Sequence, residues 1–210
     1  MMHILIADDH AIVREGLKQI LLEINPDSTI VEVSTGEEAF NLIKSSTYHL
    51  IILDVSMPGM TGLDILKAMN ERNISAPVLV LSMHPQEQYA IRAMRLGASG
   101  YLSKDSAYEE LGAAVQKVLS GGKYISSVIA EKLALSFEGE EEKQKHELLS
   151  EREFQIMCLL ARGLTVTEVG KQLFISEKTV STHRTRLLEK MGLKRNADLT
   201  LYAIRKNLIS

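Results

Sequence analysis

Short apolar runs alternate with longer amphipathic stretches over the first 120 residues. Five runs rich in Val, Ile and Leu lack the polar alternation of half-exposed strands, which is typical of strands buried on both faces of a sheet. They predict strands at residues 3–8, 29–33, 50–54, 78–82 and 100–102. Helical spacing of the apolar positions predicts helices at 11–24, 37–45, 62–72, 86–96 and 108–120. Thr35-x-x-Glu38 and Ser106-x-x-Glu109 are capping patterns that start two of these helices. Five such units predict an α/β fold with a doubly wound, flavodoxin-like, five-stranded parallel sheet.

The pattern changes after residue 121, where Gly121-Gly122 ends the fifth helix. Residues 124–135 are apolar enough for one further helix, whereas residues 138–147 are charged and lack an apolar face. Such a segment does not bury enough surface to fold, so we expect a solvated linker. The first domain is therefore predicted at residues 1–121 and the linker at 122–147.

From residue 148 onward the pattern is purely helical. Four helices are predicted at residues 151–162, 166–173, 177–191 and 196–207. Ser150-x-x-Glu153 and Thr165-x-x-Glu168 are capping boxes, and Gly163 and Gly192 stand at expected helix ends. We expect residues 148–210 to form a small all-α domain.

The two predicted domains differ in charge. Residues 148–210 carry 11 Lys and Arg against 6 Asp and Glu, a net charge of +5 in a chain whose total is −3. A basic domain favours a polyanionic partner. The apolar runs are too short to cross a bilayer, and the only cysteine, Cys158, stands in an apolar stretch and excludes an intrachain disulfide. We expect a cytoplasmic protein with a buried Cys158 and no membrane partner.

Polar residues gather where the predicted strands end. Asp8 and Asp9 end the first strand, Asp54 the third and Ser82 the fourth, and Lys104 follows the fifth. In a doubly wound sheet the carboxyl ends of the strands form one crevice, so these side chains are expected to converge. Clustered carboxylates repel each other unless they bind a cation, and an all-oxygen donor set favours Mg²⁺. A carboxylate beside Mg²⁺ is suited to attack a phosphorus atom.

Other interpretations of these residues compete. Acidic residues at strand ends are often merely solvated, and we expect His10 and His84 to lie on the rim of the pocket. A phosphatase or phosphotransferase would use Asp54 as a transient nucleophile, but Ser56 stands where a general acid would be needed. A phosphorylation-independent interaction protein would not require the complete acidic pocket.

The predicted helix at 177–191 has two faces. Val180, Leu187 and Met191 recur at helical spacing and are expected in the core. The opposite face is an exposed stripe of small polar side chains, suited either to base edges or to ordinary solvation, with phosphate-binding cations beside it. The stripe comprises Lys178, Ser181, Thr182, Thr185 and Glu189, flanked by Arg184, Arg186 and Lys190.

The first 121 residues resemble the receiver domain of two-component response regulators. The resemblance is carried by Ile6-Ala-Asp-Asp9, Leu53-Asp54-Val-Ser-Met-Pro58-Gly-Met-Thr-Gly62, Leu81-Ser82 and Gly100-Tyr101-Leu-Ser-Lys104. It implies that Asp54 is the phospho-acceptor and that Asp9, Asp54 and the backbone carbonyl of Ser56 bind Mg²⁺, with Asp8 one layer further out. It also implies that Ser82 and Tyr101 form a switch, in which Ser82 moves and Tyr101 turns inward, and that Lys104 contacts the phosphoryl group. Asp105 stands where many receivers have proline, which leaves open whether the Lys104–Asp105 peptide is cis.

The last 63 residues resemble the LuxR-type helix-turn-helix domain, and the whole chain resembles the NarL/FixJ family. Leu149-Ser-Glu-Arg-Glu153, Ala161-Arg-Gly163, Ile175-Ser-Glu-Lys-Thr-Val180, His183 and Lys190-Met-Gly192 carry this resemblance. It implies a transcription regulator, not an enzyme, whose partners are DNA, a sensor histidine kinase and a second copy of the chain after phosphorylation. The implied DNA-binding residues are Lys178, Thr179, Ser181, Thr182, His183, Arg184, Thr185 and Arg186.

Two positions of the basic domain have open interpretations. Gly170 stands where the family commonly has alanine, and we expect it to destabilise the predicted helix at 166–173 by about 1 kcal/mol. That helix braces the following one at 177–191, which we call the reader helix. The face of the last helix formed by Leu199, Tyr202, Ala203 and Ile204 serves either as a dimer contact or as part of the domain core.

Overall fold

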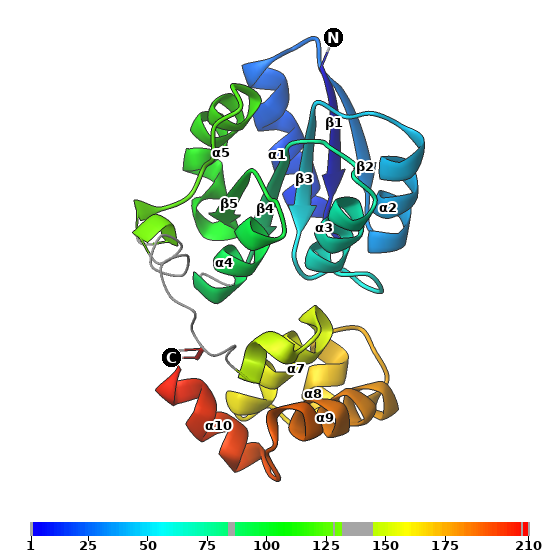
Figure 1. Cartoon of the computed structure of the whole chain (residues 1–210). Helices are drawn as coiled ribbons and strands as arrows, with labels where there is room; N and C mark the ends of the chain where they lie inside the picture. Colours follow the sequence, from blue (N-terminus) through cyan, green and yellow to red (C-terminus); the bar gives the residue numbers. More distant parts are fainter. Residues whose placement is uncertain (1, 84–86, 128, 132–144, 207, 210) are drawn as a thin grey trace. The chain divides into compact units, whose positions relative to one another are not determined.

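The computed structural model describes residues 2–83, 87–127, 129–131, 145–206 and 208–209 (Figure 1). The chain divides into two compact units, an N-terminal unit of residues 1–134 and a C-terminal unit of residues 135–210. No helix of the described residues is long and apolar enough to cross a membrane.

The N-terminal unit is built on a parallel five-stranded sheet with the strand order β2-β1-β3-β4-β5. The strands are β1 (His3–Ala7), β2 (Thr29–Val33), β3 (Leu50–Asp54), β4 (Val78–Ser82) and β5 (Gly100–Ser103). Every residue of β3 and β4 is buried, as their unbroken apolar runs predict. The sequence prediction of a doubly wound sheet is confirmed, and strand order reverses between β1 and β3.

Helices cover both faces of this sheet (Figure 1). Helices α1 (Ala11–Ile24) and α5 (Lys104–Leu119) pack on one face, and α2 (Gly36–Ser45), α3 (Gly62–Glu71) and α4 (Glu87–Arg95) lie on the other. The core between the sheet and the first pair contains buried aliphatic side chains, among them Ile6, Leu17, Leu21, Ile52, Leu81 and Leu111. This double cover leaves the carboxyl ends of the strands as the place for polar groups.

The start of α5 differs from the sequence prediction. The helix begins at Lys104, because Ser103 ends β5 and its Oγ accepts the Asp105 N–H at 3.2 Å. The predicted cap at Ser106 is therefore wrong, and its hydroxyl donates to the Ser103 carbonyl at 3.3 Å from inside the helix. The cap at Thr35 is confirmed by its bond from the Glu38 N–H at 3.3 Å. Every peptide bond of the described residues is trans, including Lys104–Asp105.

The chain after α5 returns to the edge of the sheet. The carbonyl of Tyr124 accepts the Tyr101 N–H at 2.9 Å, and its own N–H donates to Ser99 at 3.0 Å. The Tyr124 hydroxyl donates to Glu110 of α5 at 2.9 Å. The first residues of the predicted linker thus pack on the N-terminal unit, and residues 132–144 of that linker lie outside the described residues.

The C-terminal unit is entirely helical where the structure describes it. It contains η1 (Lys145–Leu148), α7 (Glu151–Ala161), α8 (Val166–Gln172), α9 (Glu177–Met191) and α10 (Asn196–Arg205). The capping boxes at Ser150 and Thr165 are both present. Gly163 and Gly192 have φ values of 94° and 65°, which confirms the predicted helix ends. Cys158 is buried, as expected.

One residue of the charged run belongs to this core. His146 is buried, and its Nδ1 lies 2.9 Å from the Tyr202 hydroxyl of α10. Its ring also packs 5.8 Å from the ring of Phe154, measured between centroids. The expectation that the run to Glu147 is wholly solvated is therefore wrong at His146, because the aromatic pocket between α7 and α10 accepts the imidazole.

The Tyr124 contacts predict a measurable contribution to stability. The free energy of unfolding should be about 1–3 kcal/mol higher for a fragment ending at residue 127 than for one ending at residue 121. The longer fragment keeps the half-buried ring of Tyr124 and five hydrogen bonds of residues 122–124, three of them at Tyr124. Urea denaturation measures both. The longer fragment with Tyr124→Phe loses only the Glu110 bond and should lie in between. Equal free energies of unfolding for the two fragments would contradict a stabilising role for the Tyr124 contacts.

Candidate acidic pocket and reader helix

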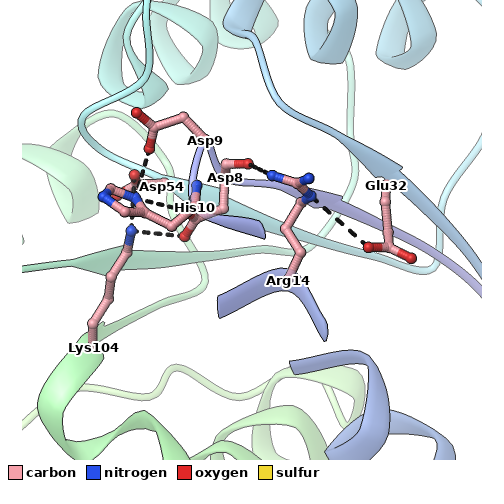
Figure 2. A network of polar contacts seen from close by, with 7 residues as sticks. All are labelled: Asp8, Asp9, His10, Arg14, Glu32, Asp54 and Lys104. Carbon is pink, nitrogen blue, oxygen red and sulfur yellow. Dashed lines mark hydrogen bonds and ion pairs between the residues drawn. The ribbon is translucent and has the colours of Figure 1, made fainter. Parts of the chain in front are cut away.

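The polar residues at the strand ends meet in one pocket of the N-terminal unit (Figure 2). Asp8 and Asp9 follow β1, Asp54 ends β3, and Lys104 is the first residue of α5. The Lys104 Nζ lies 2.7 Å from Asp8 Oδ2 and 2.9 Å from Asp54 Oδ2. One ammonium therefore joins two carboxylates from different strands, as the sequence predicts for a crevice at the switch point.

Burial dominates the electrostatics of this pocket. Asp8 and Asp54 are each 1% exposed. Burial raises the pKa of Asp54 to about 6, and the neighbouring Asp8 charge adds to the shift, while Lys104 and a backbone bond from Ser56 oppose it. Burial alone would lower the pKa of Lys104, but Asp54 and Asp8 outweigh it and raise that pKa. A raised pKa favours the charged form of Lys104, which faces two opposite charges. It disfavours the charged form of Asp54, which is buried and also faces the like charge of Asp8.

The donor set of the pocket fits a hard divalent cation. Ligand atoms of Asp8, Asp9, His10 and Asp54 all lie within 4.8 Å of one another. Three carboxylates against one buried ammonium leave negative charge uncompensated, and oxygen donors are those that Mg²⁺ prefers. His10 lies on the rim with its side chain 57% exposed, yet its Nδ1 is 2.8 Å from Asp9 Oδ1. His84, the other expected rim residue, lies outside the described residues.

Ser82 and Tyr101 lie side by side behind the pocket. Ser82 is fully buried and Tyr101 is 6% exposed. Burial raises the pKa of Tyr101 to about 12, although its hydrogen bond with Ser82 lowers that pKa and the Asp54 charge raises it further. The sequence interpretation has Tyr101 turning inward only after Ser82 moves. In this structure the ring is already inward.

The loop from β3 to α3 carries Ser56 and is held in part by Glu37, which the sequence interpretation missed. The Glu37 carboxylate of α2 accepts the Met60 N–H at 3.1 Å. A Cβ at Gly62 would lie 2.2 Å from the Asp54 carbonyl, so only glycine permits this close return of the chain. The sequence offers no spacing rule that links Glu37 to this loop, because 23 residues separate the bonded pair.

Helix α9 in the C-terminal unit presents the predicted stripe. Val180, Leu187 and Met191 are buried, as expected. Two hydroxyls are bonded back to the helix: Thr182 Oγ1 donates to the Lys178 carbonyl at 2.9 Å, and Thr185 Oγ1 donates to the Ser181 carbonyl at 3.1 Å. Their outward surface is therefore methyl groups and acceptor oxygen. The exposed members of the predicted DNA-binding set are Lys178, Thr179, Ser181, Thr182, Thr185 and Arg186.

The remaining members of that set are half-buried. Arg184 donates from Nε to Asn196 Oδ1 of α10 at 2.7 Å. Burial lowers the pKa of His183, with the charges of Arg152, Arg186 and Lys190 adding to the effect of burial and Glu153 opposing it. Lys190 itself pairs with Glu153 of α7 at 2.6 Å. These contacts fix α9 against α7 and α10, and they occupy two cations that the sequence assigned to the flanks.

Helix α8 and the turn after it brace α9. A Cβ at Gly170 would lie 2.9 Å from the Ile175 carbonyl, closer than side-chain contacts allow. The glycine therefore permits a tight turn, and the expected cost of about 1 kcal/mol to α8 stays a prediction. On α10, Leu199 and Ala203 are buried and Tyr202 bonds His146, whereas Ile204 is 56% exposed. Leu199, Tyr202 and Ala203 therefore contribute to the domain core, and a dimer contact at Ile204 stays a prediction.

Comparisons with known proteins match each unit to a known domain family. The family model for the response regulator receiver domain matches residues 4–116, and the model for bacterial regulatory proteins of the luxR family matches residues 147–203. Response regulator UvrY of Escherichia coli is 36% identical over 209 residues, covering 99% of this chain and 96% of UvrY. Response regulator GacA of Pseudomonas aeruginosa is 32% identical over 210 residues, covering 100% of this chain and 98% of GacA.

A solved structure is similar over nearly the whole chain. It is RcsB from Salmonella enterica serovar Typhimurium, bound to promoter rprA in the presence of the phosphomimetic BeF3−. The TM-score is 0.62 at 27% identity, covering 96% of this chain and 97% of that one.

The raised pKa of Asp54 predicts how stability depends on pH. The folded carboxyl keeps its proton up to about pH 6, whereas an unfolded one releases it near about pH 4. Rising pH therefore lowers the free energy of unfolding through that window. Without divalent cations, Asp54→Asn should be more stable than wild type by about 1–3 kcal/mol at pH 8, and the difference should shrink toward pH 4.

Urea denaturation at several pH values measures this difference. Asp27→Asn, at an exposed position, is the matched control and should follow the wild type throughout. A difference for Asp54→Asn that grows as the pH falls would reverse the assigned sign.

Proposed function

This chain belongs to the NarL/FixJ family of response regulators and is a DNA-binding transcription regulator; on that premise we propose that a sensor histidine kinase phosphorylates Asp54 and so switches DNA binding by the C-terminal unit. The observation that carries the proposal is the buried arrangement of Asp8, Asp54 and Lys104. Because DNA is the target, we place the protein in the cytoplasm.

Asp54 is the better acceptor of the two buried carboxylates. Both oxygens of Asp8 are engaged: Oδ1 accepts the His10 N–H at 2.8 Å, and Oδ2 pairs with Lys104 at 2.7 Å. Asp54 pairs with Lys104 through Oδ2 and accepts a backbone bond from Ser56, but its Oδ1 has no ion-pair partner among the described residues. In phosphotransfer an Asp54 oxygen would form a bond to phosphorus while the phosphorus–nitrogen bond of the donor histidine breaks. Lys104 lies where it would pair with the transferred group.

Asp9, Asp54 and the Ser56 backbone carbonyl would hold Mg²⁺, with Asp8 adjacent. The ion would neutralise the charge that gathers as a phosphoryl group approaches carboxylates. Asp9 is the least buried of the three aspartates, with a side chain 12% exposed. This places it toward solvent, where an incoming ion would be received.

The switch would act through Ser82. Phosphorylation adds charge and acceptor oxygens, and Ser82 would exchange its bond with Tyr101 for one with the phosphoryl group. Because Tyr101 is already buried, phosphorylation would not draw the ring inward but would release its bond with Ser82. We propose that the unphosphorylated N-terminal unit restrains the C-terminal unit, and that phosphorylation releases it to pair with a second copy on two DNA half-sites.

Helix α9 would enter the major groove. Thr182 and Thr185 present methyl groups and acceptor oxygens outward, which suits thymine methyls and the exocyclic amino groups of bases. Lys178 and Arg186 are exposed cations and would contact phosphates. Exposed Leu201 and Ile204 on α10 would supply the contact between two C-terminal units.

Phosphorylation should depend on Asp54 and on the cation. Wild type incubated with a small-molecule phosphoryl donor and Mg²⁺ should gain one phosphoryl group by intact-mass analysis, while Asp54→Asn and chelator-treated wild type should gain none. Beryllofluoride should tighten DNA binding by the wild type in a mobility-shift assay and leave Asp54→Asn unchanged. Full phosphorylation of Asp54→Asn, or a rate indifferent to excess chelator, would overturn this assignment.

The exposed residues of α9 should form two functional sets, one that contacts phosphates and one that reads bases. Lys178→Ala and Arg186→Ala should weaken binding to all DNA sequences similarly and lower the salt slope by about 1 each. Arg184→Ala should do so with an added loss of stability, because it also releases Asn196. Thr182→Val and Thr185→Val keep the shape, remove the acceptor oxygen and should change sequence preference. Competition binding against randomised DNA measures both effects, and a preference change confined to the cation variants would invert the model.

A further inference from the structure

Three of the four groups in the acidic cluster stand on a short turn. Strand β1 ends at Ala7 and helix α1 starts at Ala11, so Asp8, Asp9 and His10 lie in neither element. His10 is the N-cap of α1 but makes no side-chain cap bond, and the first turn of α1 has no acidic residue. The imidazole is turned to the carboxylates instead. The start of α1 thus lacks the usual side-chain cap.

The side chain of Arg14 ties the start of α1 to the preceding turn in another way. Its Nη1 donates to the Asp8 carbonyl at 2.7 Å, reaching back from α1 to the end of β1 (Figure 2). This carbonyl belongs to the residue whose carboxylate pairs with Lys104. On its other side the guanidinium faces Glu32, with Nε 3.8 Å from Oε2. One side chain therefore connects the ends of three elements: β1, α1 and β2.

Glu32 fixes the direction of this guanidinium. It stands opposite Ile6 in the parallel pairing of β1 and β2, so its position is set by the sheet. It also pairs with Lys18, one turn further along α1, at 2.8 Å. Arg14 is 18% exposed and Lys18 is 38% exposed. Both cations belong to α1 and share Glu32, but only Arg14 contacts the turn that carries the acidic cluster in the described residues.

We propose that Arg14 is a positioning residue for the Mg²⁺ site: it fixes the Asp8 carbonyl and with it the orientation of Asp9. The inference rests on the proposed metal site. Groups that hold a metal ligand from behind change metal affinity by about 10–100-fold when removed. A planar guanidinium with donors on two edges serves the carbonyl and Glu32 together, which a single ammonium does less well.

The test titrates the full-length chain with Mg²⁺ alone and follows the backbone amide signals of Asp9 and Asp54 by NMR. Arg14→Ala should raise the Mg²⁺ dissociation constant by about 10-fold or more. Lys18→Ala is the matched control, since it removes the same charge from the same helix and the same partner, and should change it by less than about 2-fold. Arg14→Lys keeps the charge and should lie between wild type and Arg14→Ala.

These measurements distinguish a failure of the role assigned to Arg14 from a failure of the proposed Mg²⁺ site. Equal Mg²⁺ affinity in Arg14→Ala and wild type, or equal weakening in Arg14→Ala and Lys18→Ala, would overturn the role of Arg14 and leave the metal site intact. A wild type whose amide signals ignore Mg²⁺ would overturn the proposed site itself. If Arg14→Ala does not fold, as judged by amide dispersion without Mg²⁺, Arg14→Gln takes its place with the same expectation.

Discussion

Two carboxylates that are buried against one another constrain the whole N-terminal unit. Each lies at the end of a central strand, and a single lysine from α5 reaches both. This compensation is incomplete, since the pKa of Asp54 is still raised to about 6. The folded chain therefore carries negative charge at a buried position that Lys104 compensates only in part. A fold that keeps this arrangement gives up stability there, and under the proposed function it would gain a site that responds to cations and to an added phosphoryl group.

The C-terminal unit uses charge in the opposite way. Its ion pairs and charged hydrogen bonds, such as Glu153 with Lys190 and Arg184 with Asn196, join helices to one another. They set the direction of α9 and leave its outward row to small hydroxyl side chains and the exposed cations Lys178 and Arg186. If α9 enters DNA as proposed, affinity would come from few charges, and discrimination would fall to short side chains that approach bases closely.

The sequence predicted the sheet, most helix bounds and the membership of the acidic pocket, because each pocket residue stands where an apolar run stops. It failed where the contact depends on tertiary geometry. The bond from Arg14 to the Asp8 carbonyl depends on the path of α1 over the strand end, and its pairing with Glu32 on the register of β1 with β2. The burial of His146 depends on a pocket formed by Phe154 and Tyr202, which no local pattern in a charged run indicates. The start of α5 was misplaced because Ser103 serves as both the last strand residue and the helix cap.

Tyr101 connects the pocket to the segment that follows α5. Its side chain bonds Ser82, which stands at the end of β4 beside Asp54. Its backbone N–H bonds the carbonyl of Tyr124, in the segment that leaves α5 toward the C-terminal unit. A shift of Ser82 toward a phosphoryl group would remove the side-chain bond of Tyr101 while its backbone bond holds the segment to β5. Under the proposed switch, communication between the units would require only that the freed ring of Tyr101 alter the backbone pairing of Tyr101 with Tyr124. Such a local change is of the kind that biases a two-state element.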